Sequence, residues 1–260
     1  MAFCRVHLSP VVFAVYLTIA VCGCASSGGK KTYTATERAR MLVDIANAAL
    51  MEGDAIGALQ NLLRAEKEDP KLPEIYHSKA LAYFAKHDLK TAISEVKKAL
   101  KLFPEYPDAN NTFGKFLIDQ GNYEAAVKPL SLAAVNPLYR DAFKAYTNLG
   151  ILYYRRGNYT QASVNLDKAI QAAPNSACIA LYYRGHIRLR ESRLNEAIAS
   201  YDQATRKYCV SFVDAHLALG IAYEKTRQYA KAREKFLEIQ QRYPNTETAE
   251  KAVSHLRYLP

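Results

Sequence analysis

Small residues recur along this chain about every 35 positions, and this recurrence restricts the possible folds more than any other feature of the sequence. Two sets share successive intervals of 34, 34, 36, 35 and 35 residues. The first set is Ala46, Ala80, Gly114, Gly150, Gly185 and Gly220, and the second is Ala58, Ala92, Ala126, Ala162, Ala197 and Ala232. Two independent sets with identical intervals indicate an array of six structural repeats.

Each repeat carries the signals of two helices joined by a tight turn. In three copies a Gly followed by Asn or Asp stands between the two small residues, at Gly53-Asp54, Gly121-Asn122 and Gly157-Asn158. Gly suits the residue after a helix, and Asn or Asp suits the start of the next one. Most copies close with a Pro, which ends the second helix. We therefore expect pairs of antiparallel helices of about 14 residues each.

The small residues explain how such pairs can stack. Two helix axes approach to roughly 8–10 Å only where no large side chain intervenes, so Ala or Gly of the first helix should face Ala of the second. Half of the 260 residues are apolar, which is enough to bury a continuous core. Residues 246–259 have apolar residues at helical spacing and should cap the open end of the stack. The predicted fold is an all-α solenoid of six helix pairs with a C-terminal capping helix.

This pattern resembles the tetratricopeptide repeat. The fourth copy has it most completely, and its matching residues are Leu149-Gly150, Tyr153, Ala162, Leu166, Ala169 and Pro174. The resemblance covers about residues 39–244 and implies a helical scaffold that binds other proteins. The copies depart from the pattern at a longer connection, 136–141, and in the fifth copy, where Cys209 replaces the closing Pro.

The N-terminal residues 1–23 have the features of a secretory signal peptide. They contain no acidic residue, carry Arg5 early and continue as an apolar stretch too short to span a membrane comfortably. The segment ends in Val21-Cys22-Gly23-Cys24, which resembles a bacterial lipobox, with Cys24 as the residue to be lipidated. That resemblance implies sorting to the outer membrane, and the alternative is a plain cleaved signal. Residues 24–35 then form a flexible tether, and residues 36–260 form the repeat domain.

Two further cysteines belong to the fifth copy. Cys178 opens its first helix and Cys209 ends its second, so an antiparallel pair would bring them side by side. Export to an oxidising compartment favours a disulfide between them, whereas two separate buried thiols are the alternative. A structural bridge of this length would stabilise the fold by about 3–4 kcal/mol.

The chain shows no pattern that carries chemistry. No two of its six His residues have the spacing of helical metal ligands, and no phosphate-binding Gly loop or nucleophile motif is present. We interpret His186 and His216 as helix-surface residues, and Glu66, Glu68, Asp69 and Glu95 as parts of solvated faces. We therefore expect a protein that is not an enzyme and that binds no cofactor or metal.

The formal net charge is +10 at pH 7. Such a charge permits binding to nucleic acid, to anionic lipid headgroups or to an acidic protein. Acidic residues are interleaved along most of the chain, and an exported protein would seldom meet nucleic acid. We therefore expect no nucleic-acid partner.

The first helices of the repeats should line a protein-binding groove of exposed apolar and amide side chains, suited to an extended strand or an amphipathic helix. Counting outward from the small residues predicts this lining as Asn47, Leu50, Leu81, Phe84, Asn111, Lys115, Ile118, Thr147, Ile151, Tyr154, Tyr182, His186, Leu189, Leu217 and Ile221, with Met51 and His77 beside it. The tetratricopeptide clamp for a C-terminal carboxylate is not matched, because Val43 and Asp108 occupy the places of its cations.

Six such repeats behind a lipobox are similar to the type IV pilus pilotins of the PilF/PilW/Tgl type. Further likeness lies in Asn136-Pro137-Leu138-Tyr139, in the two cysteines around the fifth copy and in the ending that starts at Pro244-Asn245. The resemblance implies an outer-membrane lipoprotein on the periplasmic side that binds secretin subunits and promotes their localisation and multimerisation. The alternative is a periplasmic lipoprotein scaffold for cell-wall enzymes or for outer-membrane protein assembly.

Overall fold

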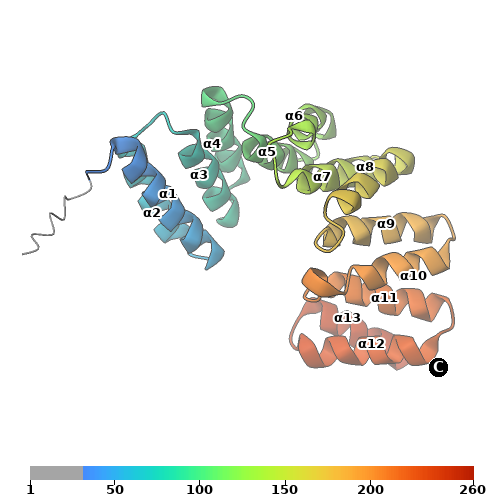
Figure 1. The fold of residues 1–260 in the computed structure, drawn as a ribbon. Helices are drawn as coiled ribbons and strands as arrows, with labels where there is room; N and C mark the ends of the chain where they lie inside the picture. Colours follow the sequence, from blue (N-terminus) through green and yellow to red (C-terminus); the bar gives the residue numbers. More distant parts are fainter. Residues whose placement is uncertain (1–31) are drawn as a thin grey trace, which may run out of the picture. The chain divides into compact units, whose positions relative to one another are not determined.

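The computed structural model describes residues 32–260, whose helices belong to one compact unit, Thr34–Pro260. The predicted signal peptide, the lipobox with Cys24 and most of the tether lie outside the described residues. Within residues 32–260 the chain forms α-helices, one short 3-10 helix and no strand (Figure 1). The first six helices are α1 (Ala35–Met51), α2 (Ala55–Glu68), α3 (Pro73–Ala85), α4 (Leu89–Leu102), α5 (Pro107–Asp119) and α6 (Tyr123–Val135). The later elements are α7 (Ala142–Arg155), α8 (Tyr159–Ala172), α9 (Cys178–Arg190), α10 (Leu194–Gln203), η1 (Lys207–Cys209), α11 (Val213–Lys225), α12 (Tyr229–Arg242) and α13 (Glu247–Tyr258).

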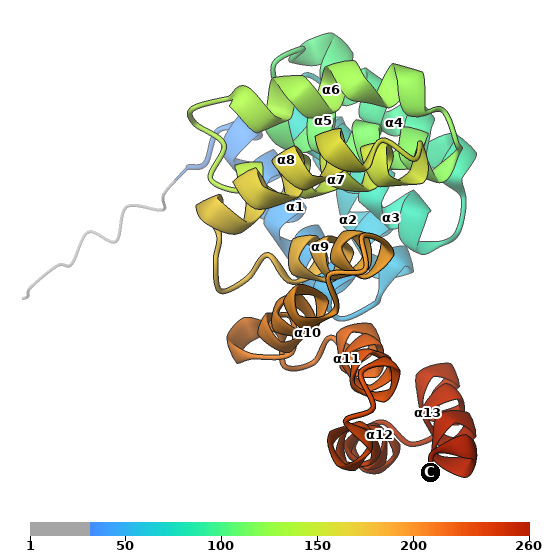
Figure 2. The same cartoon turned by 90° about the vertical axis from the view of Figure 1, so that its right-hand side faces the viewer.

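These helices form the predicted solenoid. Each pair from α1–α2 to α11–α12 is one repeat, and each second helix also packs against the first helix of the next repeat (Figures 1 and 2). Some first helices of neighbouring repeats contact one another as well, as α1 contacts α3, α5 contacts α7 and α7 contacts α9. Helix α13 packs on α12 and α11 and caps the last repeat as predicted. The longer connection, 136–141, precedes α7, which has 14 residues against 13 in α5.

The small residues lie where helices meet. Ala46, Ala80 and the second set of alanines are fully buried. At Gly150 a Cβ would come 2.5 Å from a methyl carbon of Leu166, and at Gly185 it would come 2.4 Å from the ring of Tyr201. A large side chain of the second helix therefore lies directly on the glycine of the first.

The turns within the repeats share one backbone conformation. The second residue after each first helix has a positive φ in all six copies: 85° at Gly53, 61° at His87, 78° at Gly121, 75° at Gly157, 60° at Ser192 and 59° at Arg227. Glycine adopts this conformation without steric cost, whereas the other three residues do not. In the first four copies the next residue caps the second helix, since its side chain accepts a backbone N–H bond three residues further on, as Asp54 does from Gly57 at 2.8 Å.

Cys178 and Cys209 form a disulfide, with their Cα atoms 5.4 Å apart. It joins the start of α9 to η1, which follows the ten-residue helix α10. The bridge thus closes the fifth repeat at the place where other copies end with a Pro.

Glu95 does not lie on a solvated face, so that prediction was wrong. Glu95 is 6% exposed and Lys79 is 5% exposed. Oε1 of Glu95 accepts a bond of 2.8 Å from Lys98, and Oε2 lies 3.3 Å from Nζ of Lys79. Charged residues of α3 and α4, the two helices of one repeat, meet here, which the pattern of a single helix cannot reveal.

Candidate protein-binding site

The predicted lining residues all lie on the first helices of the six repeats, but they do not form one continuous surface. The structure gathers part of them into two hollows. One is the first pocket, which lies among α1, α3 and α5. The other is the α7–α9 groove, which lies among α5, α7, α9 and α11 and is itself made of two adjoining hollows. Phe84, Tyr154, His186, Leu189, Leu217 and Ile221 line neither of them.

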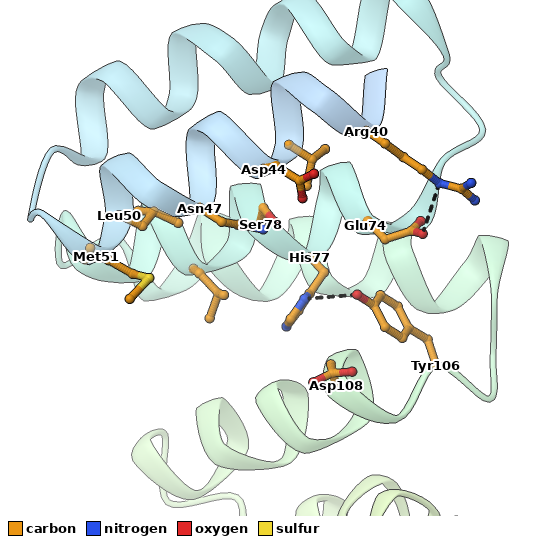
Figure 3. A pocket seen from close by; sticks show the side chains of 13 residues that line it. Arg40, Asp44, Asn47, Leu50, Met51, Glu74, His77, Ser78, Tyr106 and Asp108 are labelled. Atoms are coloured by element: carbon orange, nitrogen blue, oxygen red, sulfur yellow. Dashed lines mark hydrogen bonds and ion pairs between the residues drawn. The ribbon is translucent and has the colours of Figure 1, made fainter. Parts of the chain in front are cut away.

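The first pocket has a volume of about 720 Å³ and combines an apolar end with a polar end (Figure 3). Leu50, Leu81 and Met51 supply apolar walls, and Met51 is 91% exposed. Asn47 accepts a bond of 2.7 Å from the hydroxyl of Ser78. Three residues of the predicted lining, Asn47, Leu50 and Leu81, therefore meet in this pocket, on the first helices of the first two repeats.

Carboxylates dominate the polar end of the first pocket. Asp44, Glu74 and Asp108 line it, and the one cation among its lining residues, Arg40, lies 4.0 Å from Glu74 (Figure 3). Burial, together with the nearby charge of Asp141, raises the pKa of Asp108. This end therefore repels a carboxylate, which agrees with the mismatch to the carboxylate clamp.

His77 forms the floor of the first pocket as a neutral ring. Its Nε2 lies 2.9 Å from the Thr112 hydroxyl, and its Nδ1 lies 3.5 Å from the hydroxyl of Tyr106 (Figure 3). Burial lowers the pKa of His77 to about 4. The ring consequently supplies no positive charge against the carboxylates at neutral pH.

The α7–α9 groove consists of two adjoining hollows of about 410 and 340 Å³. Lys115, Asn148 and Ile179 line both. The larger hollow is otherwise lined by Asn111, Phe143, Lys144, Thr147, Ser176, Ala177 and Cys178, and the smaller by Ile118, Asp119, Ile151, Arg155, Tyr182, Tyr183, Phe212 and Asp214. Residues from four first helices thus contribute to a single elongated surface.

Two asparagines stand at the centre of the α7–α9 groove. Nδ2 of Asn148 donates a bond of 2.9 Å to Oδ1 of Asn111. This bond leaves Asn148 with one amide hydrogen and its carbonyl oxygen, the donor and acceptor pair that matches a peptide group. The pair is suited to holding the main chain of an extended segment.

Aromatic rings line the far end of the groove. The ring of Tyr182 lies 5.2 Å from that of Phe212, 5.6 Å from that of Tyr183 and 4.3 Å from that of His186, all edge to face. Nδ1 of His186 lies 2.9 Å from the hydroxyl of Tyr201. Burial lowers the pKa of His186 and raises that of Tyr182 to about 12, so both are neutral at pH 7.

Family models of the tetratricopeptide repeat match residues 83–134, 143–176 and 179–246, which together exceed half of the chain. The chain is a tetratricopeptide repeat protein. This agrees with the register of the helix pairs and with the fold expected from the sequence.

Two curated relatives share part of this tetratricopeptide array. Type IV pilus assembly protein PilF of Pseudomonas aeruginosa is 26% identical over 169 residues, which are 64% of this chain and 67% of PilF. Human tetratricopeptide repeat protein 13 is 27% identical over 171 residues, but these are 64% of this chain and only 19% of the human protein. The chain therefore spans about a fifth of the human relative and two thirds of PilF.

Solved structures show the same fold. The crystal structure of PilW, described as a widely conserved type IV pilus biogenesis factor, has a TM-score of 0.72 at 19% identity, covering 83% of this chain and 98% of PilW. Pseudomonas aeruginosa PilF has a TM-score of 0.71 at 19% identity, covering 85% of this chain and 99% of PilF. The tetratricopeptide array thus extends over nearly the whole of both structures.

Several residues that were predicted to line the protein-binding groove are more buried than expected. Ile118 is 3% exposed and Thr147 is 7% exposed, and the Thr147 hydroxyl donates to the carbonyl of Phe143, so both belong to the floor. Leu217 and Ile221 pack against the core beneath α13. The prediction that His216 lies on a helix surface was wrong. This residue is 2% exposed, and its Nε2–H donates to the carbonyl of Val210 at 2.9 Å.

Sequence reasoning missed most of the groove lining, including Phe143, Lys144, Asn148, Ile179, Tyr183 and Phe212. Asn148 precedes the predicted Ile151 by three positions and could have been found by its helical spacing. Ile179 precedes the predicted Tyr182 by three positions and could have been found in the same way, whereas Phe212 reaches the groove from just before α11, which no spacing within α9 predicts. Among residues 32–260 no cluster of three potential metal ligands occurs, and no helix is long and apolar enough to cross a membrane.

Proposed function

We propose that this protein is a membrane-anchored scaffold of type IV pilus biogenesis that binds subunits of the outer-membrane secretin. In this proposal lipid on Cys24 holds the chain at the periplasmic face of the outer membrane. The relationship to PilF, at 26% identity over two thirds of that protein, carries the proposal. The likeness of fold to PilW over 98% of its length supports it.

The first pocket and the α7–α9 groove suggest how the scaffold would act. An unassembled secretin subunit would be held through exposed segments that lie along the first helices, in the first pocket, the α7–α9 groove or both. Confinement of scaffold and subunit to one membrane raises the local concentration of subunits, which promotes their multimerisation. The proposed role changes no covalent bond and requires no cofactor.

The test is co-purification from detergent extracts of the source organism, with the tagged full chain as bait. The amount of secretin per bait is measured for the wild type and for a double variant in the lining, Leu81→Arg in the first pocket with Ile179→Asp in the α7–α9 groove. Val135→Arg is the matched control, because Val135 is 70% exposed on α6 and lines neither hollow.

We expect secretin with the wild type and the control, and less than a fifth of that amount with the double variant at unchanged helix content. Recovery of a cell-wall hydrolase or a component of outer-membrane protein assembly in place of secretin would contradict the proposal and favour the alternative scaffold role. Equal recovery by all three baits would remove the lining from the binding surface.

A further inference from the structure

The disulfide lies in the wall of the α7–α9 groove. Cys178 itself lines the larger hollow, between Ala177 and Ile179. Its partner Cys209 precedes by three residues Phe212, which lines the smaller hollow. The bridge therefore ties residues 176–179, which line the larger hollow, to the stretch 209–212, which ends at Phe212 in the smaller hollow.

The bridge adds to non-covalent contacts of these stretches, since the ring of Phe212 lies 5.2 Å from that of Tyr182 and the carbonyl of Val210 accepts bonds from His216 and Tyr243. Helix α9 starts without a side-chain cap at Ala177, and η1 is a three-residue 3-10 helix with no side-chain cap. Lys207 donates a bond of 2.7 Å to the side chain of Asn175, but both residues are exposed, so this bond contributes little. The disulfide is a covalent restraint between the start of α9, which carries Ile179, and the stretch that leads into Phe212.

The charge of the larger hollow indicates what it would hold. Lys115 and Lys144 line it, and no carboxylate does. Each lysine has an acidic partner: Asp119, 3.0 Å from Lys115, lines the adjoining smaller hollow, and Asp141, which pairs with Lys144, lines neither part of the groove. The first pocket, by contrast, is lined by three carboxylates and one cation. The first pocket and the larger hollow of the groove consequently prefer ligands of opposite charge.

The walls of the larger hollow are apolar. Phe143, Ala177 and Ile179 form them, and Ile179 is 47% exposed although it is a large apolar side chain. An aliphatic side chain of a ligand would bury Ile179, while an adjacent carboxylate would meet the two lysines. The Asn148 amide beside them offers one donor and one acceptor to a peptide group.

We propose that the α7–α9 groove holds an extended segment of the partner protein in which an acidic residue stands next to an aliphatic one, and that the Cys178–Cys209 bridge sets its affinity. The idea rests on the proposed function, because it specifies which part of the lining holds the partner. The aliphatic side chain enters the larger hollow, the carboxylate lies at Lys115 and Lys144, and the following residues pass Asn148 toward Tyr182 and Phe212. Without the bridge, this side of the groove keeps only its non-covalent contacts, so Ile179 and Phe212 are held less rigidly and ordering them costs binding energy.

The binding experiment uses the full chain in detergent and two fluorescein-labelled synthetic peptides. The probe is Gly-Ser-Asp-Leu-Ser-Val-Ser-Gly, and the control has Lys in place of Asp. Fluorescence anisotropy at low salt measures the Kd of each. We expect the acidic probe to bind at least tenfold more tightly than the control, and 0.5 M NaCl to remove most of this difference. Equal affinity for both peptides, or no binding of the acidic probe, would overturn the inference.

Three variants separate the groove from the rest of the surface. Ile179→Asp and Lys144→Gln should each weaken binding of the acidic probe at least fivefold. Ile56→Asp is the matched control, since Ile56 is 63% exposed on α2 and lines neither hollow. Circular dichroism of each variant establishes that it is folded. Binding that is unchanged in folded Ile179→Asp would place the probe elsewhere and contradict the proposal.

The role of the bridge is tested with the double variant Cys178→Ser/Cys209→Ser at a temperature where it is fully folded. We expect its affinity for the acidic probe to fall at least fivefold, whereas an affinity equal to that of the wild type would refute the dependence on the disulfide. Secretin recovery measured in parallel distinguishes the two proposals. If wild-type bait recovers no secretin, the proposed function fails while the peptide results stand. If folded Ile179→Asp retains secretin fully, the groove assignment fails alone.

Discussion

Nζ of Lys79 lies 3.3 Å from Oε2 of Glu95, and both side chains are more than nine-tenths buried. Lys79 also donates a bond of 3.0 Å to Glu66 of the preceding repeat. Burial lowers the pKa of Lys79, but the hydrogen bond to Glu66 and the charge of Glu95 outweigh it, so the net direction is upward. The cluster therefore holds a charged lysine and joins the first two repeats.

Removing one member of this cluster should be costly. Glu95→Ala leaves the ammonium of Lys79 buried with Glu66 alone, so we expect the free energy of unfolding to fall by about 3 kcal/mol. Glu68→Ala is the control, because the pair of Glu68 with Arg38 is exposed and should contribute less than about 1 kcal/mol. Urea denaturation of both variants provides the measurement. Similar losses in the two variants would show that burial does not govern the strength of this cluster.

A second prediction concerns the contact between Gly185 and Tyr201. Gly185→Ala places a Cβ 2.4 Å from the Tyr201 ring, which is fully buried, so the ring must shift and weaken its bond to His186. We expect a loss of about 1–3 kcal/mol. The first repeat accommodates Ala46 with Leu62 at the equivalent positions. Gly185→Ala should therefore cost less free energy of unfolding in the Tyr201→Leu background than in the wild type. A purely additive double variant in thermal unfolding would disprove this coupling.

The repeat register, the helix pairs and the capping helix could be predicted because each depends on local spacing. Helices need only a period and an end signal, and copies at a fixed interval need only to stack. The turns illustrate the limit of that reasoning. His87, Ser192 and Arg227 adopt the same positive φ as the glycines of other copies, because the helices on either side determine the turn.

The division of the lining into two hollows could not be predicted. Helical spacing identifies which residues share a face, as it did for Lys115 and Tyr182, but the depth of a hollow depends on what the next repeat contributes. Phe212 reaches the groove from the next repeat, and Ile118 is buried by its neighbours. Lys79 and Glu95 failed to stand out for the same reason, since a charged residue at one helix position gives no sign of its partner on another.

Acid should destabilise the fold through its buried histidines. Burial lowers the pKa of His77 to about 4, below its ordinary value of 6.5, so the unfolded chain binds protons more readily than the folded one. The corresponding stability is present above pH 6.5 and is lost as pH falls from 6.5 toward 4. We expect His77→Gln to reduce this dependence by about 1–3 kcal/mol, whereas the exposed substitution Ile56→Gln, which adds and removes no titratable group, should leave it unchanged. Urea denaturation between pH 4.5 and 7.5 tests this, and identical slopes for the wild type and both variants would contradict it.

The predicted lipid anchor can be examined separately from binding. If lipid on Cys24 attaches the chain to the membrane, Cys24→Ser should move it from the membrane pellet to the soluble periplasmic fraction. The readout is quantitative immunoblotting of fractions after spheroplast lysis, with Cys22→Ser as the matched control that should stay in the pellet. Retention of Cys24→Ser in the membrane fraction after a high-salt wash would reject lipidation at this residue.

The disulfide should stabilise the fold because it closes a loop in the unfolded chain between two residues 31 positions apart and so restricts its conformations. Cys178→Ser/Cys209→Ser is expected to lower the free energy of unfolding by about 2–4 kcal/mol, chiefly by restoring conformational entropy to the unfolded state. The measurement is urea denaturation of both proteins without reductant, and the wild type with reductant should approach the double variant. Because the bridge lies between α9 and η1, hydrogen exchange should rise most in residues 174–183 and 205–214 and little in α1–α4. A uniform rise throughout the chain would mean that the bridge acts on global stability alone and leaves the groove wall no more mobile than the rest.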